Sequence, residues 1–228
     1  MTYPILRAAV CSLRLLLDWS PNPNHIPLAQ KQFFEQEKID LVLTREEPAD
    51  LSIKLAPQFI RSGEKSSVIA VLVDQALQGF CIPKDAPFDL NGKIIGVKPQ
   101  GTTASLARHF WKDLTFINKR DFGVVDAIGG TFKNVEPYLF DRPVRFIPWT
   151  DLGVPNYPEL LIVGDIDADV AKRFRRALTA SIAYCRKHPN VVFSSDVGTE
   201  QRSITLDVWA RSQKVDLKPL KEWLSCLD

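Results

Sequence analysis

The chain has 228 residues, enough for one large domain or two small lobes with a sizeable core. Apolar residues make up 45% and charged residues 25%, which is ordinary for a soluble globular protein, and the net charge of +2 is too small to indicate nucleic-acid binding. The four cysteines stand apart with no CxxC pair, which argues against a zinc knuckle or a disulfide framework. We therefore predict no metal site.

The N-terminal stretch 1–19 is apolar, but it does not have the pattern of a signal peptide. Arg7 and Arg14 interrupt it, and the basic residue expected near its start is missing. The segment 8–11 matches a lipoprotein cleavage site only in part, because Val10 is larger than the residue that such a site needs. No apolar run reaches the roughly eighteen residues of a membrane span. We expect a cytoplasmic protein, or a periplasmic one if the native N-terminus is longer.

Hydrophobic patterns in the first part of the chain predict a strand, loop, helix, strand unit. Its strand covers 12–18, and an amphipathic helix over 27–37 follows, with Pro27 suited to the first turn. The next expected elements are strands 39–43, 50–54, 67–74 and 78–83, with a helix over 55–63. Two prolines then stiffen 83–87, where we expect the chain to cross between lobes.

The second part of the chain repeats the alternation of strands and helices. The expected strands are 94–98, 115–118, 124–128, 144–148 and 159–163, and the expected helices are 102–112, 132–140, 168–187 and two short ones near the end. Short loops between such elements predict an α/β fold with a mostly parallel sheet in each lobe. The expected lobes are 1–82 with 165–228, and 83–164.

Two short segments resemble each other within the chain. ADLSIK at 49–54 and VDAIGG at 125–130 each place an aspartate before an apolar stretch that leads into a loop and then a helix. This internal similarity indicates two related lobes, although a single similarity of this kind also arises by chance.

The stretch PQGTTASLARHFW, residues 99–111, follows a buried strand and opens a helix. Free backbone N–H groups and the hydroxyls of Thr102 and Thr103, next to Gly101, suit an anion at this helix start. The alternative is that Thr102 only caps the helix. A Walker loop is excluded, because no GKS or GKT follows.

Two further loops place polar side chains after predicted strands. In AIGGTFKNVEPY a strand ends on two glycines, and Asn134 and Glu136 follow at the edge where open α/β sheets bind ligands. The alternative there is a solvated helix start. In DLGVPNYPEL, Tyr157 beside Asn156 suits stacking on a flat ligand, although such a loop alone proves little.

Lys54 and His25 each have a functional and a structural interpretation. Lys54 ends the strand DLSIK, where an amine that faces a cleft can form an imine with an aldehyde or bind an anion. Most lysines at strand ends are simply solvated. His25 has no cysteine or aspartate at metal-ligand spacing, so a hydrogen-bonded structural group is the plainer interpretation.

The chain resembles the family that joins eukaryotic thiamine pyrimidine synthases to bacterial pyrimidine-precursor-binding proteins of ABC importers. Four segments carry the resemblance in this order: LLLDWSPNPNHIPLAQKQFFEQEKIDLVL, LNGKIIGVKPQGTTASL, VDAIGGTFKNVE and DLGVPNYPELLIV. It runs from about residue 12 to 190 and implies the type II periplasmic-binding-protein fold, with two α/β lobes and a ligand cleft between them. Compared with the family, the chain looks shorter at 44–50 and 118–126, which implies that both lobes are trimmed.

The resemblance implies a small heteroaromatic ligand, either an aminopyrimidine precursor of thiamine or pyridoxal phosphate. Trp19 would stack on the ring, and Gly101, Thr102 and Thr103 would hold an anionic end. The other implied ligand residues are Asn22, Asn24, His25, Lys54, Gln58, Gly130, Asn134, Glu136, Asn156 and Tyr157. An ABC importer is the implied partner if the protein is exported.

The resemblance leaves binding and catalysis open. In the synthases a lysine that matches Lys54 forms an imine with pyridoxal phosphate, and a histidine four residues later is consumed, with iron assisting. Gln58 stands at that position here, and the cysteine-rich run of the synthases is missing. We therefore expect a binding protein first and a synthase-like enzyme second. An interaction module that has lost ligand binding is the third alternative.

Overall fold

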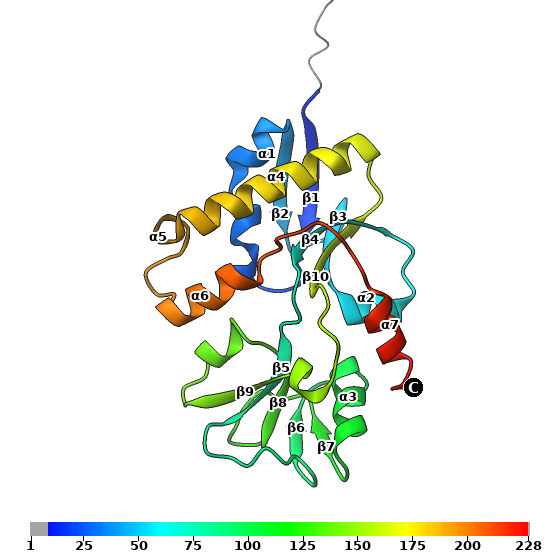
Figure 1. Cartoon of the computed structure of the whole chain (residues 1–228), viewed down its shortest axis with the longest axis vertical. Coiled ribbons are helices and arrows are strands. Elements are labelled where there is room, and N and C mark those ends of the chain that lie inside the picture. The colour runs from blue at the N-terminus through cyan, green and yellow to red at the C-terminus, as the bar shows by residue number, and fades with distance from the viewer. Residues whose placement is uncertain (1–8, 228) are drawn as a thin grey trace, which may run out of the picture.

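The computed structural model describes residues 9–227 and shows two lobes, each built on a five-stranded sheet (Figure 1). Residues 1–8, which bear on the question of export, lie outside the described residues. Among the helices of residues 9–227, none is both long and apolar enough to cross a membrane.

The first sheet has the strand order β2-β1-β3-β10-β4. Its strands are β1 (Cys11–Leu16), β2 (Ile39–Thr44), β3 (Leu51–Leu55), β4 (Ser67–Val73) and β10 (Leu160–Gly164). β1 pairs in parallel with β2 and β3, whereas β10 runs antiparallel to β3 and β4. Leu13 and Leu15 of β1, and Ile39 and Leu41 of β2, are buried with the two-residue period of a strand that has one face on the core.

The helices of this lobe are η1 (Pro23–Ala29), α1 (Lys31–Gln36), α2 (Ala56–Ser62), α4 (Ala168–Lys187), α5 (Pro189–Val192), α6 (Thr199–Val208) and α7 (Lys218–Leu224). The predicted helix over 27–37 is in fact a 3-10 turn followed by a short α-helix. The Asn22 side chain accepts the Asn24 N–H at 3.0 Å and starts η1 early, and Pro27 inside η1 has no N–H to continue an α-helical ladder.

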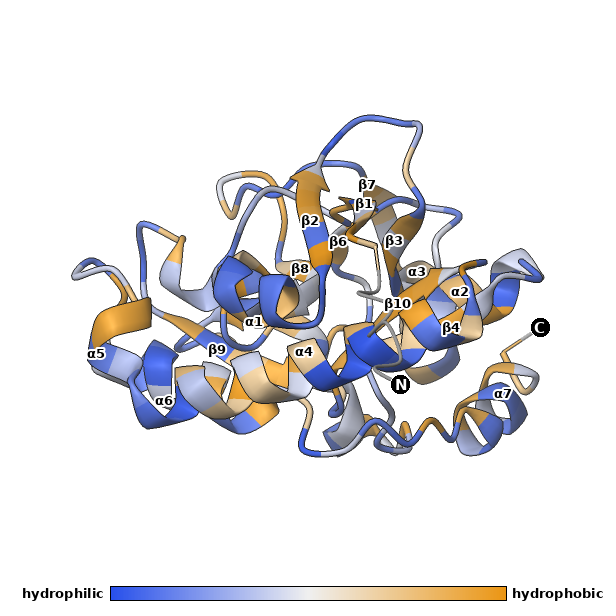
Figure 2. Cartoon of the chain, turned by 90° about the horizontal axis from the view of Figure 1, so that it is seen from above, coloured by the Kyte–Doolittle hydropathy of each residue, from blue (hydrophilic) through white to orange (hydrophobic). Residues whose placement is uncertain are grey.

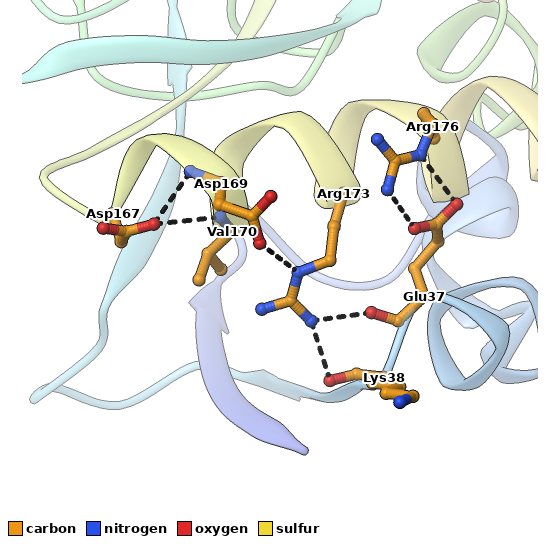
Figure 3. A network of polar contacts seen from close by, with 7 residues as sticks. All are labelled: Glu37, Lys38, Asp167, Asp169, Val170, Arg173 and Arg176. Carbon is orange, nitrogen blue, oxygen red and sulfur yellow. Dashed lines mark hydrogen bonds and ion pairs between the residues drawn. The ribbon is translucent and has the colours of Figure 1, made fainter. Parts of the chain in front are cut away.

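Helix α4 lies across one face of the first sheet, with α1 beside it (Figure 1). Figure 2 shows hydrophobic and hydrophilic residues interspersed along α4, and its buried residues recur every three to four positions, as on one face of an amphipathic helix. Two arginines fix its position: Arg173 Nη1 donates to the Glu37 carbonyl at 2.8 Å, and Arg176 makes two bonds to the Glu37 carboxylate at 2.9 and 2.6 Å (Figure 3). Since α4 is anchored to the loop between α1 and β2, the polar face of the helix contributes to its docking.

The second sheet has the strand order β7-β6-β8-β5-β9. Its elements are β5 (Gln78–Pro83), β6 (Ile94–Gly96), α3 (Thr102–Phe110), β7 (Thr115–Ile117), β8 (Ala127–Phe132), η2 (Glu136–Tyr138), β9 (Val144–Pro148) and η3 (Trp149–Leu152). The predicted helix over 132–140 is wrong, because β8 continues to Phe132 in its pairing with β5 and leaves room only for η2. Both sheets are mixed rather than mostly parallel, since β10 and β5 run against their neighbours.

The chain passes from the first sheet to the second between β4 and β5 and returns between β9 and β10. The first crossing therefore lies at residues 74–77. This corrects the crossing predicted at 83–87, whose prolines end β5 and follow it inside the second lobe.

The two sheets share one topology, and the repeated aspartates occupy equivalent places in it. The Asp50 N–H donates to the Arg14 carbonyl at 3.0 Å, and Asp50 Oδ2 accepts the Arg14 N–H at 2.7 Å. Asp126 makes the same two bonds with Ile94, both at 2.8 Å. Each aspartate thus joins the third strand of its lobe to the first. Because β3 begins opposite Leu15, at the end of β1, residues 45–50 reach it without a helix.

Candidate ligand-binding cleft

A cavity of about 560 Å³ lies between the lobes, at the carboxyl ends of β1, β3 and β8. The first lobe lines it with residues 16–19, 52–55 and Gln58, and the second with Lys98, Arg120, Gly130, Phe132 and Glu136. Crevices at the carboxyl ends of strands are the usual ligand sites of open α/β sheets. Both lobes therefore contribute side chains to a single candidate site.

A smaller cavity of about 260 Å³ shares part of this lining and extends to the start of α3. Gln58, Lys98, Arg120 and Gly130 are among the residues that line both cavities. Gly101, Thr102, Thr103 and Gln78 line the smaller one alone. Gly101 is the N-cap of α3 and no side-chain capping bond is present, so the interpretation of Thr102 as the cap is wrong.

Trp19 lies just after β1 in the wall of the larger cavity and is 40% exposed. Its neighbour Asp18 lines the same cavity and accepts a hydrogen bond from His25 Nε2 at 2.8 Å. His25 Nδ1 accepts the Asn22 N–H at 3.3 Å, which leaves the ring proton on Nε2. His25 is 3% exposed and therefore positions Asp18 from behind the wall. Asn22 and His25 line a separate pocket of about 280 Å³, not the interlobe cavity.

Lys54 and Gln58 both lie in the cavity wall, as the resemblance implied. Lys54 Nζ lies 3.4 Å from Glu64 Oε2, and the two side chains are 37% and 30% exposed. Lys54 therefore reaches the cavity as half of an ion pair.

Arg120 and Glu136 form the charged part of the second-lobe wall. Arg120 Nη2 donates to Glu136 Oε1 at 3.0 Å, and Glu136 Oε2 accepts the Phe132 N–H at 2.7 Å. Burial raises the pKa of Glu136, while the Phe132 N–H and Arg120 oppose that rise. Sequence reasoning missed Arg120 and Lys98, although Lys98 ends the predicted strand 94–98 and Arg120 follows the predicted strand 115–118, at the carboxyl edge where a basic residue can face a cleft.

Asn24 and Asn134 lie outside both cavities, which corrects their expected contact with the ligand. Both are fully buried, and Asn134 Nδ2 donates to Asn24 Oδ1 at 2.7 Å and to Thr205 Oγ1 at 3.1 Å. Gln201 Nε2 donates to the Asn134 carbonyl at 2.9 Å. Polar groups buried this deeply need such partners. The pair joins η1 and α6 to the loop after β8 and so connects the lobes.

Asn156 and Tyr157 lie at the crossings between the lobes, and Tyr157 is too buried to stack on a ligand. Asn156 Oδ1 accepts the Ala76 N–H at 2.9 Å, and Tyr157 is 2% exposed. Burial raises the pKa of Tyr157 well above its ordinary value, and the nearby Glu159 carboxylate adds to the rise. The loop therefore supports the return crossing instead of lining the cleft.

Glu159, which sequence reasoning also missed, joins the two crossings. It is fully buried and accepts the Leu77 N–H at 3.0 Å, the Gln78 N–H at 3.3 Å and the Gln78 side-chain amide at 2.7 Å. Its signal in the sequence is a glutamate placed directly before an apolar strand in PELLIV.

The comparisons with known proteins agree with this geometry. A model described as NMT1/THI5 like matches residues 22–191, which is most of the chain. The chain belongs to the NMT1/THI5-like family. No curated protein sequence matches this family member.

Solved structures show the same fold at low sequence identity. A protein from Bordetella bronchiseptica RB50 has a TM-score of 0.69 at 14% identity, over 95% of this chain and 89% of that chain. A Candida albicans gene product, described as having the generic periplasmic binding protein fold, has a TM-score of 0.66 at 16% identity, over 95% and 90%. An ABC transporter protein from Parabacteroides distasonis has a TM-score of 0.55 at 14% identity, over 89% and 86%. The NMT1/THI5-like chain thus has the two-lobe, type II periplasmic-binding-protein fold.

Proposed function

We propose that this protein binds a small flat heteroaromatic ligand in the interlobe cleft, an aminopyrimidine related to thiamine biosynthesis or pyridoxal phosphate. The observation that carries the proposal is the cavity of about 560 Å³, which is lined by Trp19 from the first lobe and by polar side chains of the second. Pockets of roughly 300–1,000 Å³ with aromatic walls and a few polar groups are typical of small-molecule sites. Ligands held by both lobes favour domain closure.

The charges of the wall support a ligand with both a hydrogen-bond donor and an anionic end. Asp18 and Glu136 provide acceptors, and Lys54, Lys98 and Arg120 provide cations. The first turn of α3 lies in the adjoining cavity, where its N–H groups suit an anionic substituent. An aminopyrimidine phosphate and pyridoxal phosphate both meet these requirements.

A role in uptake is the physiological setting that we propose if the protein is exported. The likeness to an ABC transporter protein supports it, and the partner would then be the membrane component of such an importer. The same cleft would serve as a binding site inside the cell without that partner.

Titration calorimetry with the aminopyrimidine precursor of thiamine, its phosphate and pyridoxal phosphate tests the proposal. We expect at least one compound to bind, and Trp19→Ala to weaken it about 3- to 10-fold, because ring stacking contributes about 0.5–1.5 kcal/mol. Phe88→Ala is the control, since Phe88 is an exposed aromatic residue outside both cavities. Absence of heat for all three compounds would overturn the proposal.

A synthase-like enzyme is the second candidate, and the place of Lys54 in the cavity wall favours it. Imine formation needs the Lys54 amine to be free to attack the aldehyde, whereas the amine here lies 3.4 Å from the Glu64 carboxylate. Gln58 has no imidazole to donate, and residues 9–227 hold no group of three His, Cys, Asp or Glu side chains arranged for the iron of the synthases. An imine absorbance band with pyridoxal phosphate that is lost in Lys54→Ala would support the enzyme, and no band at millimolar aldehyde would exclude it.

A further inference from the structure

Gln78 begins β5 directly after the first crossing, and its side-chain amide has a fixed orientation. The residue is 5% exposed, and its Nε2 donates to Glu159 Oε1 at 2.7 Å. The other carboxylate oxygen, Oε2, already accepts the N–H groups of Leu77 and Gln78. Since both Glu159 oxygens accept from N–H groups in this geometry, the Gln78 amide turns its NH₂ group toward Glu159 and its carbonyl oxygen away.

The carbonyl oxygen of Gln78 lies beside Gly130, where the two cavities meet. A Cβ placed on Gly130 would lie 3.8 Å from Gln78 Oε1 and 3.1 Å from Thr103 Oγ1. Gly130 has φ +66°, so a glycine keeps this point open without strain. Gln78 and Thr103 line the smaller cavity, and Gly130 lines both. A ligand that extends from the larger cavity into the smaller one therefore passes an acceptor oxygen.

We propose that Gln78 is a specificity-determining residue that accepts a hydrogen bond from an N–H or O–H group of the ligand, and that Glu159 is its positioning residue. The proposal rests on the proposed function, because it concerns a ligand in the same cleft. The ligand class becomes narrower: a heteroaromatic ring that carries an amino or hydroxyl donor on the side facing Gly130.

The isosteric variant Glu159→Gln tests the orientation directly. The carbonyl oxygen of the new glutamine is needed by the two backbone N–H groups, so its NH₂ group faces the Gln78 amide. We expect the Gln78 amide to rotate in response and to present its own NH₂ group to the cavity. The acceptor beside Gly130 then becomes a donor. Glu159→Gln should therefore reverse or abolish a preference for donor-bearing ligands and keep the shape of the site.

The measurement is calorimetry with the aminopyrimidine precursor and two analogues, one with the amino group replaced by methyl and one with the hydroxyl group removed. In the wild type we expect one analogue to bind about 2- to 12-fold more weakly, since a hydrogen bond contributes about 0.5–1.5 kcal/mol. Glu159→Gln and Gln78→Met should both bring the ratio of the dissociation constants, analogue over parent, to about one or below. Asp50→Asn is the control: Asp50 also accepts a backbone N–H but lies outside both cavities.

Each outcome decides the question. Equal binding of parent and analogues by the wild type would overturn the inference and leave the proposed function standing. A ratio that survives in both variants would also overturn it, because the donor would then be recognised elsewhere. Lower thermal stability with an unchanged ratio would give Glu159 a purely structural role. Failure of the wild type to bind the parent would remove both proposals for this ligand. If Gln78→Met does not fold, the wild-type ratio and Glu159→Gln still decide.

Discussion

At the scale of single residues, the segment 17–25 after β1 supports the cleft more than it lines it. Asp18 and Trp19 reach the cavity, whereas His25 and Asn24 lie behind it in hydrogen-bonded positions. His25 makes two hydrogen bonds, as its structural interpretation predicts. The buried pairing of Asn24 could not be predicted, because Asn134 lies 110 residues away in the sequence and only the fold brings them together.

Replacing His25 with alanine should destabilise the protein. The change leaves the Asn22 N–H and one Asp18 oxygen without their partner, and a buried polar group left unpaired costs about 1–3 kcal/mol. We expect a drop of that size in the free energy of unfolding, measured with urea. The exposed Gln36 provides the control, since Gln36→Ala should change the free energy by less than about 0.5 kcal/mol. A similarly small effect of His25→Ala would contradict the supporting role.

At the scale of elements, strands with continuous apolar runs and the long helix could be predicted well. The predicted helix 168–187 has the bounds of α4, because a hydrophobic period and the Asp167 cap mark it locally. The crossing between lobes could not be found in the same way. Whether 78–83 joins the first or the second sheet depends on its pairing with β8 and β9. These strands lie far along the chain, so their pairing leaves no local pattern in the sequence.

Glu159, which joins the two crossings between the lobes, should make the stability of the protein depend on pH. Burial raises the pKa of Glu159 above its ordinary value of 4.5. The folded state then holds the proton more tightly than the unfolded state, so the contribution of this group to the free energy of unfolding falls as the pH rises from 4.5 through the raised pKa. Glutamine cannot titrate, so we expect the stability of the wild type relative to Glu159→Gln to fall with pH over this window.

Urea unfolding of both proteins at several pH values measures this difference. Glu136, whose pKa burial also raises, is present in both proteins, so its contribution cancels. A difference between wild type and variant that stays constant with pH would show that Glu159 has the same pKa in the folded and unfolded states.

At the scale of the whole molecule, the C-terminal segment links the lobes outside the two crossings. Trp209 forms a bridge with Val73 at the edge of the first sheet, and α7 then packs against α2 (Figure 1). From α7, Trp223 reaches α3 of the second lobe, where its ring stacks on Phe110 at 6.5 Å. Two short terminal helices were predicted, but their docking was not, because a short amphipathic helix does not identify the surface that it covers.

Trp223→Ala should therefore loosen the two lobes. The change removes the ring contacts with Phe110 and His109, and we expect the free energy of unfolding to fall by about 1–3 kcal/mol, below the 3–5 kcal/mol typical of a fully buried tryptophan. Because α7 contacts α3 across the lobe boundary, we also expect the variant to have a larger radius of gyration than the wild type by small-angle scattering. Lys221→Ala, at an exposed position of the same helix, is the control. A stability loss without any change in the radius of gyration would mean that α7 stabilises the first lobe alone.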